Sequence, residues 1–346
     1  MIIKCSAFVA VQFHKPPSGA DNEQLSNWVL GLSRAFSGHK ELIQTSNGLV
    51  LSVNPVPIRS DDQLLPGEAC QYLIIRDKAG SGPGPKELAE RNPACAGLLV
   101  EENGGVFLFR GASGSQVVYG AWDQNTAILC SNLVFLNGLD LEISRQSLAW
   151  YLRYFYIPSP FTIYGKVSSV LPGHIQGIFA VQKLESLAAD STSVQKDQDA
   201  LASNAPDDQF ERQMKSCCIE AIKDQKEKRG LLLSGGKDSS GLAVAVALTK
   251  ETVDCLTIGF PGDQYCERSD AESVVQALGL SGKVQYVSSW MARKQWEQFC
   301  KVIGQPMGDP AALPLWCGLT SSFSEYDVLL DGTGNDSYFG LRPALK

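Results

Sequence analysis

The sequence predicts two domains of different class, an N-terminal α+β domain rich in strands and a C-terminal α/β domain built on a parallel sheet. The chain has 346 residues, which is more than one domain usually holds. Residues 1–185 contain short β-branched and aromatic runs separated by Gly- and Asn-containing turns, such as QVVYGAWDQNTAILCSNLVFL. Beyond residue 208, apolar strands alternate with helices of about 10 to 15 residues, which is the pattern of parallel βαβ units.

Two helices are predicted within the N-terminal domain, and a linker follows it. The first helix covers about residues 22–36. The second covers 144–156, where apolar residues recur at helical spacing before prolines at 158 and 160 end the helix. Residues 186–208 are small and polar and contain no aromatic side chain, which is typical of a linker. The domains are therefore expected to span residues 1–185 and 209–346.

The C-terminal domain is predicted to begin with a helix that Asp207 or Asp208 caps and Gly230 ends. After it the sequence predicts strands at 231–233, 253–258, 283–287 and 328–330, separated by helices at 239–249, 268–278 and 289–303. The strands are continuous apolar runs, as expected of a parallel sheet that is covered on both faces. Ligands of such sheets bind beyond the carboxyl ends of the strands.

Composition restricts the partners and the compartment. The net charge is −7, whereas proteins that bind nucleic acids or membrane surfaces usually carry a basic excess. No run of about 18 apolar residues predicts a transmembrane helix. The N-terminal MIIKCSAFVAVQFHK lacks the basic region and cleavage site of a signal peptide and is predicted to be a first strand. The ten cysteines form no CxxC pair, which indicates reduced, mostly buried thiols in the cytoplasm.

The strongest functional signal is LLLSGGKDSSGLAVAVA, residues 231–247. A buried strand leads into two glycines and then into a helix that opens with Asp238. The first N–H groups of a helix have no partner within it, and together with the helix dipole they favour an anion. Gly235 and Gly236 allow the backbone to approach a phosphate closely. The spacing is neither a Walker A loop nor GxGxxG, so it predicts another kind of phosphate-binding turn, with a simple capped helix as the structural alternative.

SGGKDSS matches the SGGxDS signature of the PP-loop ATP pyrophosphatases, which release pyrophosphate from ATP. Alone it would leave thiouridine synthases and NAD or GMP synthetases open. Four further stretches resemble the asparagine synthetases: TIGFPGDQYCERSDAESVVQALG, GQPMGDPAALPLW, VLLDGTGNDSYFG and SRQSLAWYLRYFYIPSPFTIYGKVSSVLPGH. The resemblance covers most of residues 95–185 and 209–346. It implies a four-layered, Ntn-hydrolase-like sandwich, followed by a PP-loop domain like that of the adenine nucleotide α-hydrolases.

The resemblance also implies residues that hold ATP and Mg²⁺. Those that would cradle pyrophosphate are Ser234, Gly235, Gly236, Ser239 and Ser240. Those that would line the adenine site are Leu232, Leu233, Gly259 and Phe260. Gly332 and Gly334 would let the next loop approach the nucleotide. Asp238 and Asp336 match two Mg²⁺-binding carboxylates, and this cation usually takes one or two carboxylates plus phosphate oxygens. Lys237 receives no role, and Glu267 matches a family carboxylate but suits a helix cap equally well. Asp336 could also be a turn residue, and Phe260 a core residue.

Three features depart from the glutamine-dependent members of that family. Those enzymes begin Met-Cys-Gly, and the cysteine uses its own α-amine as base, whereas Cys5 follows four residues and is expected to be a buried strand residue of an inactive glutaminase-like domain. Ser337 replaces the glutamate of the family's GxGxDE, as often happens in β-lactam synthetases, carbapenam synthetases and lasso-peptide cyclases. In the relatives, the chain continues beyond the position that matches Lys346 with helices that carry substrate contacts and a catalytic lysine. Domain 209–346 is therefore expected to lack this helical part.

The sequence therefore predicts an ATP-dependent carbon–nitrogen ligase that adenylates a small-molecule or peptide carboxylate, releases pyrophosphate and lets ammonia or a substrate amine attack, without using glutamine. The alternative is a catalytically silent or split nucleotide-binding subunit that needs a partner polypeptide for the missing helices. A tRNA-thiolating enzyme would show a basic surface and paired catalytic cysteines, and neither is visible. No nucleic-acid or membrane partner is expected. The acid, the amine and the assembly state stay open.

Overall fold

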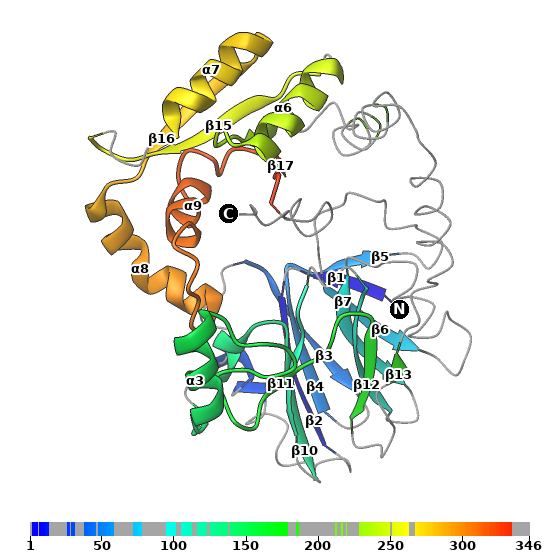
Figure 1. The fold of residues 1–346 in the computed structure, drawn as a ribbon. Helices are drawn as coiled ribbons and strands as arrows, with labels where there is room; N and C mark the ends of the chain where they lie inside the picture. The colour runs from blue at the N-terminus through cyan, green and yellow to red at the C-terminus, as the bar shows by residue number, and fades with distance from the viewer. Residues whose placement is uncertain are drawn as a thin grey trace, which may run out of the picture. The chain divides into compact units, whose positions relative to one another are not determined.

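The chain folds into two compact units, as the computed structural model shows (Figure 1). Unit 1 comprises Met1–Val194 and Cys300–Asp309, and unit 2 comprises Gln195–Phe299 and Pro310–Lys346. The structure describes residues 2–5, 7–13, 26–27, 29–31, 38–45, 48–58, 72–77, 95–101, 105–112, 116–122, 125–137, 139–178, 185–186, 212, 216, 219, 228–249, 251–262 and 267–333. In this part of the chain, no helix is both long and apolar enough to span a membrane.

Unit 1 contains two β-sheets. The seven-stranded sheet has the order β13-β12-β8-β7-β6-β1-β5, and the six-stranded sheet has the order β11-β9-β10-β2-β4-β3. Neighbouring strands are antiparallel except β6 and β7, which are parallel. The strands are β1 (Ile2–Cys5), β2 (Ala7–Phe13), β3 (Lys40–Thr45), β4 (Gly48–Val53), β5 (Val56–Ile58), β6 (Tyr72–Asp77), β7 (Ala96–Glu101), β8 (Val106–Arg110), β9 (Tyr119–Trp122), β10 (Thr126–Cys130), β11 (Ser168–Ser169), β12 (His174–Ile178) and β13 (Glu185–Ser186).

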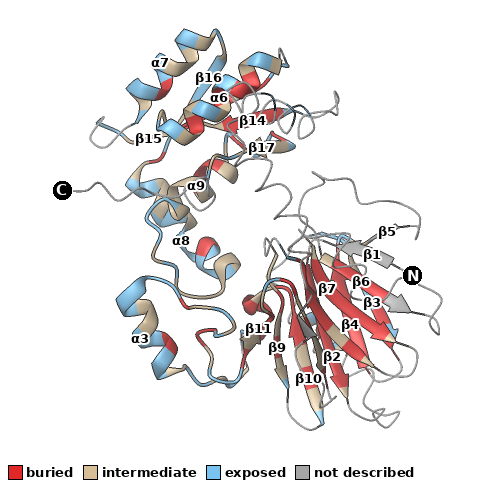
Figure 2. Cartoon of the chain, turned by 45° about the vertical axis from the view of Figure 1, so that its right-hand side comes forward, coloured by how far each residue is buried: buried red, intermediate tan, exposed pale blue. Residues whose placement is uncertain are grey.

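The core of unit 1 lies between the two sheets, where Phe8 and Leu129 of one sheet meet Ile74, Leu98 and Leu108 of the other. Both sheets are also apolar on their outer faces, so strands such as β4 and β7 are almost wholly buried (Figure 2). The short 3-10 helix η2 (Leu133–Leu136) packs on the outer face of the six-stranded sheet. The predicted helix at 22–36 lies mostly outside the described residues. The four-layered Ntn-hydrolase-like arrangement therefore stays a prediction.

The second predicted helix of unit 1 is α3 (Arg145–Tyr154), slightly shorter than the expected 144–156. Ser144 caps it, because its side chain accepts a hydrogen bond from the Ser147 N–H at 3.2 Å. The helix ends at Phe155, which adopts the left-handed conformation with φ 62°. The stop therefore comes before the prolines, because a left-handed residue already turns the chain away.

Unit 2 is built on a parallel sheet with the order β16-β15-β14-β17, which confirms the predicted parallel sheet. Its elements are β14 (Arg229–Leu232), α6 (Lys237–Thr249), β15 (Asp254–Gly259), α7 (Arg268–Leu278), β16 (Ser281–Tyr286), α8 (Ser289–Ile303), α9 (Ala312–Leu319) and β17 (Val328–Leu330). The last turn of α8, from Cys300 onward, belongs to unit 1. One face of the sheet packs on α6 and α7, and the other on Leu319 of α9 and on Phe323 (Figure 1). Cover on both faces explains the apolar runs of β14, β15 and β17. The edge strand β16 differs from the expected apolar run, because Ser281, Lys283 and Gln285 make it largely polar and most of it is exposed.

Several boundaries differ from the sequence-based expectation. Helix α6 begins at Lys237, two residues before the predicted start, and α9 was not predicted at all. Pro314 lies in the first turn of α9, where a helix tolerates a residue without an N–H group. Ser186, the first residue of the predicted linker, belongs to β13. Of the predicted helix after Asp208, only residues 212, 216 and 219 are described, and they are helical.

The strand order places a topological switch point at β14. From β14 the chain proceeds to β15 and β16 on one side, and it then returns to place β17 on the other side. The segments that follow β14 and β17 therefore both begin at the carboxyl edge of the sheet, on neighbouring strands. A crevice opens at such a point beyond the carboxyl ends of the strands, which is where open α/β sheets bind ligands.

Candidate functional site

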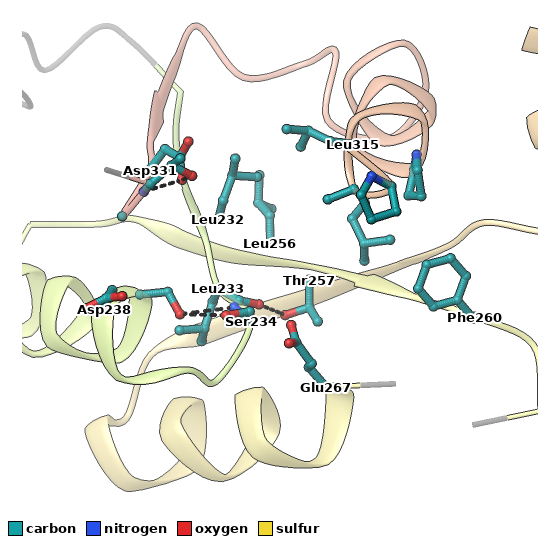
Figure 3. Close-up of a pocket in the computed structure, with 17 residues that line it drawn as sticks. Leu232, Leu233, Ser234, Asp238, Leu256, Thr257, Phe260, Glu267, Leu315 and Asp331 are labelled. Atoms are coloured by element: carbon teal, nitrogen blue, oxygen red, sulfur yellow. Dashed lines mark hydrogen bonds between the residues drawn. The ribbon is translucent and has the colours of Figure 1, made fainter. Parts of the chain in front are cut away.

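A cavity of about 540 Å³ lies at this sheet edge, within the size range of small-molecule sites (Figure 3). One wall is apolar and is made by Leu232, Leu256 and Ile258 of the strands together with Pro314 and Leu315 of α9. The opposite side is polar and contains Ser234 and the first turn of α6. The cavity thus has two parts: an apolar surface that suits a flat ring, and a helix N-terminus that suits an anion.

The turn between β14 and α6 requires glycine at Gly235. This residue has φ +84°, and a Cβ placed on it would lie 2.6 Å from Cβ of Asp270 in α7. Helix α6 then begins at Lys237, and its first intrahelical bond runs from Ser240 N–H to the Gly236 carbonyl at 2.9 Å. Asp238 and Ser239 come before Ser240 in the chain, so their N–H groups lie ahead of this first intrahelical bond. They therefore belong to the end of the helix that attracts negative charge.

The loop after β17 approaches the same helix end. A Cβ on Gly332 would lie 3.2 Å from the backbone carbon of Asp238 and from the nitrogen of Ser239. Only a residue without a side chain allows this approach without displacing the helix. The structure thus brings the predicted loop glycine against the predicted phosphate-binding turn, although 93 residues separate Gly332 from Ser239 in the sequence (332 − 239).

The hydroxyl groups of the turn are engaged with the turn itself. The Ser234 and Ser239 oxygens lie 3.0 Å apart, and either hydroxyl can donate to the other. The Gly236 N–H donates to Ser234 Oγ at 3.2 Å, and Ser239 Oγ donates to the Gly236 carbonyl at 3.2 Å. Among the described residues, the buried Ser240 Oγ has no hydrogen-bond partner, and it does not line the cavity. The hydroxyls of Ser234 and Ser239 would therefore have to exchange partners to reach a phosphate.

Every charged side chain among the described residues that line the cavity is acidic: Asp238, Glu267 and Asp331. Glu267 is at the N-cap of α7 but makes no capping hydrogen bond with its side chain. Figure 3 shows its carboxylate directed towards Ser234 and Thr257. Asp331 accepts hydrogen bonds from N–H and Oγ1 of Thr333 at 3.0 and 2.8 Å. A polyphosphate in this cavity would need added positive charge.

The described residues contain no group of three His, Cys, Asp or Glu side chains arranged to hold a metal. Asp238, one of the two predicted magnesium ligands, lines the cavity. The other, Asp336, lies outside the described residues, as do Gly334, Ser337 and Cys266. The predicted magnesium pair therefore stays a prediction.

Of the predicted site residues, seven line the cavity: Leu232, Leu233, Ser234, Asp238, Ser239, Phe260 and Gly332. Gly235 and Gly236 form the turn beside it. At Gly259 an added Cβ would face Val284 and Tyr286 of β16, at 3.0 and 3.1 Å. The roles assigned to these residues stay predictions.

Three residues of β15 and the segment before α9 contribute to the cavity without having been predicted. Leu256 and Ile258 line the cavity because they point to the same face as Leu232, which pairs with Leu256 in register. Thr257 also borders the cavity, although its hydroxyl is bonded to the Leu233 carbonyl, and Pro310 and Ala311 come from the segment before α9. Side chains alternate between the two faces of a strand, so a strand at 253–258 already implied that Leu256 and Ile258 share one face. No sequence pattern marks the segment from Pro310 to Leu315 as part of the site.

Comparisons with known proteins agree with the motifs. Residues 215–344 match the family model described as asparagine synthase. The chain is 24% identical to asparagine synthetase [glutamine-hydrolyzing] 1 of Bacillus subtilis over 226 residues, covering 64% of this chain and 34% of that protein. It is 25% identical to a putative asparagine synthetase [glutamine-hydrolyzing] of Mycobacterium bovis over 240 residues, covering 68% and 35%. The chain thus spans about a third of the length of these curated relatives.

Among solved structures, the NH3-dependent NAD synthetase of Campylobacter jejuni in complex with nitrate matches at 20% identity and a TM-score of 0.27, covering 35% of this chain and 50% of that one. A score this low carries no argument about the fold. The family model and the curated relatives confirm the asparagine synthetase-like character that the motifs predicted.

Proposed function

We propose that this asparagine synthetase-like chain takes part in ATP-dependent amide formation. A substrate carboxylate attacks the α-phosphorus of ATP, and pyrophosphate leaves as the acyl-adenylate forms. Ammonia or a substrate amine then attacks the acyl carbon, and AMP leaves as the amide forms. The observation that carries this proposal is the glycine turn at the start of α6, which opens into an apolar-walled cavity at the switch point of a parallel sheet.

The residues of the cavity suit a nucleotide. Leu232, Leu256 and Leu315 offer an apolar surface to the adenine ring. The N–H groups of the first turn of α6 face the region where the phosphates would lie. Because these dipoles are fixed in place before the reaction, they stabilise charge that gathers on the departing pyrophosphate.

We propose that Asp238, whose carboxylate borders the cavity, holds Mg²⁺ together with Asp336. The fit rests on the donor set: a carboxylate borders the cavity, and the phosphates would supply further hard oxygen ligands. A bound divalent cation would neutralise part of the charge on the leaving pyrophosphate.

The acidic lining supports a second proposal, that a cationic side chain reaches the site from outside the described residues. Asp238, Glu267 and Asp331 add negative charge to a cavity that would hold a polyphosphate. A partner polypeptide could supply a compensating lysine or arginine.

We propose that glutamine is not the nitrogen donor. Lys4 and Cys5 lie within β1, where Cys5 pairs with Tyr72 of β6 and Lys4 pairs with both Leu73 and Val56. This placement supports Cys5 as a strand residue with a peptide nitrogen, which cannot act as the base of an N-terminal nucleophile. In an amide-forming assay, ammonia should support the reaction and glutamine should not, and Cys5→Ala should leave the ammonia-dependent rate unchanged.

The central test is exchange of labelled pyrophosphate into ATP, with Mg²⁺ present and a panel of carboxylic acids. Exchange that depends on one of the acids supports the ligase. ATP binding with exchange only after a partner polypeptide is added supports the split enzyme. ATP binding without exchange under either condition supports the silent subunit. A protein that neither binds ATP nor catalyses exchange removes the proposed function.

A further inference from the structure

A single peptide group, the one between Leu233 and Ser234, is held on both sides by side-chain hydroxyls. Its carbonyl accepts a hydrogen bond from Thr257 Oγ1 at 2.8 Å, and its N–H donates to Ser239 Oγ at 3.2 Å. Thr257 comes from β15 and Ser239 from the first turn of α6. We call these two hydroxyls the hydroxyl clamp; Figure 3 shows both bonds as dashed lines.

This peptide lies where the strand stops and the turn begins. The last backbone bond between β14 and β15 runs from Leu233 N–H to the Leu256 carbonyl at 2.9 Å. At the next position a side-chain hydroxyl replaces the backbone partner. The chain can therefore leave the sheet without losing a buried hydrogen bond, and the plane of this peptide sets the direction in which the turn starts.

We propose that Thr257 is a positioning residue for the anion-binding turn and that it acts through the Leu233 carbonyl. The inference rests on the proposed function, because it assumes that the turn receives the phosphates of a nucleotide. Thr257 borders the cavity, but its hydroxyl is engaged by Leu233 and is not offered to a ligand. Ser239 is the other half of the hydroxyl clamp.

The physical reason is the burial of the carbonyl's surroundings. Leu233 is 2% exposed and Thr257 is 5% exposed, so water cannot readily replace the hydroxyl. An unpaired buried carbonyl is unfavourable, and rotation of the peptide towards solvent would relieve it. That rotation would also turn the Ser234 N–H away from Ser239 and move the backbone that follows it.

The experiment compares Thr257→Val, Thr257→Ser and Thr249→Val in the full chain, with ATP binding measured by calorimetry. Valine keeps the branched shape of threonine and removes the hydroxyl, whereas serine keeps the hydroxyl. Thr249 is the matched control, because its hydroxyl donates to the Val246 carbonyl at 2.7 Å but lies at the far end of α6. We expect Thr257→Val to weaken ATP binding about tenfold, and Thr257→Ser and Thr249→Val to bind like the wild type.

The proposal is overturned if Thr257→Val binds ATP with wild-type affinity, or if Thr249→Val loses as much affinity as Thr257→Val. A coupling test sharpens it. Because Thr257 and Ser239 hold the same peptide, the double variant Thr257→Val/Ser239→Ala should lose less affinity than the product of the two single losses. If the double variant lost affinity by the full product of the two single losses, Thr257 and Ser239 would not act through the same peptide.

A measurement without ligand separates this inference from the proposed function. We expect Thr257→Val to speed amide hydrogen exchange at Ser234–Lys237 about tenfold or more, and Thr249→Val to leave it unchanged. If the wild-type chain binds no ATP, the proposed function fails and the exchange rates alone decide on the clamp. Equal exchange in wild type and Thr257→Val would then overturn the positioning role.

Discussion

At the scale of single residues, the site depends on positions where a side chain would block a close approach. A Cβ added to Gly332 would lie 3.2 Å from the backbone of Asp238 and Ser239, closer than ordinary van der Waals contact. The glycine within α6 itself, Gly241, differs, because an added Cβ there would meet nothing within 4 Å. Substituting Gly332 and Gly241 in turn therefore separates the effect of a steric clash from the general effect of replacing a glycine.

We expect Gly332→Ala to weaken ATP binding several-fold, by about 1 kcal/mol, because the new methyl group would push the β17 loop away from Asp238 and Ser239. Gly241→Ala should instead stabilise the fold by about 0.5–1 kcal/mol, because Gly241 is an exposed position inside a helix. Calorimetric ATP titration and thermal unfolding of both variants test this pair. Equal ATP affinity in the two variants would refute the close-approach argument.

Asp238 is the residue on which the magnesium proposal depends most directly. Asp238→Asn keeps the size of the side chain and removes its charge, so we expect weaker Mg²⁺-dependent ATP binding and loss of pyrophosphate exchange. Asp140→Asn, at an exposed position of unit 1, is the control and should change neither. If Asp238→Asn retained wild-type dependence on the Mg²⁺ concentration, Asp238 would not be a ligand.

At the scale of elements, a charged cluster ties the strands of unit 2 together at the edge opposite the cavity. Tyr326 donates to Asp254 at 2.7 Å, and the ammonium groups of Lys228 and Lys283 lie 4.8 and 5.1 Å from the centre of its ring. Glu325 bridges the same two lysines, with Lys283 at 3.1 Å. The cluster joins β14, β15 and β16 to the segment that leads into β17, which carries the Gly332 loop.

This cluster makes stability depend on pH. Burial raises the pKa of Asp254, but hydrogen bonds from Tyr326, Ser281 and Lys283 outweigh that effect and hold the pKa below its ordinary value of 3.8. Hydrogen bonds from Lys228 and Lys283 lower the pKa of Glu325 from its ordinary 4.5. A lowered carboxyl pKa stabilises the folded state above the unfolded-state value, and this stabilisation is lost as the pH falls through the folded-state value.

We therefore expect the melting temperature of unit 2 to fall as the pH drops below about 4.5. Tyr326→Phe removes the hydrogen bond to Asp254, so it should lower the melting temperature at neutral pH and reduce the further loss in acid. Thermal unfolding across pH of the wild type and the variant provides the measurement. Parallel curves for the two proteins would show that the Tyr326–Asp254 contact contributes nothing to the acid response.

The strands also determine which thiols react. Burial raises the pKa of Cys130 in β10 to about 12 and that of Cys255 in β15 to about 11, whereas Cys300 in α8 is exposed. The thiolate is the reactive form, so an alkylating reagent should modify Cys300 well before the two strand cysteines. Mass spectrometry of peptides after timed alkylation of the native protein measures the order. Modification of Cys255 as fast as Cys300 would contradict the burial argument.

At the scale of the whole molecule, the two units have different architectures, and the cavity is made by unit 2 residues alone. ATP should accordingly slow hydrogen exchange at the end of β14, the start of α6 and the end of β17, and leave the buried strands β2 and β4 of unit 1 unchanged. Exchange mass spectrometry with and without ATP and Mg²⁺ tests the location. Protection that appeared only in β2 and β4 would place the nucleotide elsewhere.

Much of unit 2 was predictable because its signals are local. The limits of α7 at 268–278 and of α8 at 289–303 match the prediction, since a glycine follows each helix and both helices carry apolar residues at helical spacing. Helix α9 was not predicted because Pro310 and Pro314 disfavour a helix locally. Packing of its apolar residues near β15 stabilises the helix nevertheless. Propensity is a weak guide when tertiary packing decides.

The amino-acid sequence by itself determined the parallel βαβ pattern, the glycine turn after β14 and the asparagine synthetase-like character, because each depends on residues that are neighbours in the chain. Only the tertiary structure decided that Gly332 meets the start of α6, that Thr257 holds the Leu233 carbonyl, and that every charged side chain among the described residues of the cavity is acidic. These facts depend on strand order and on the register of Leu232 with Leu256, which are set by burying the apolar faces of distant segments together.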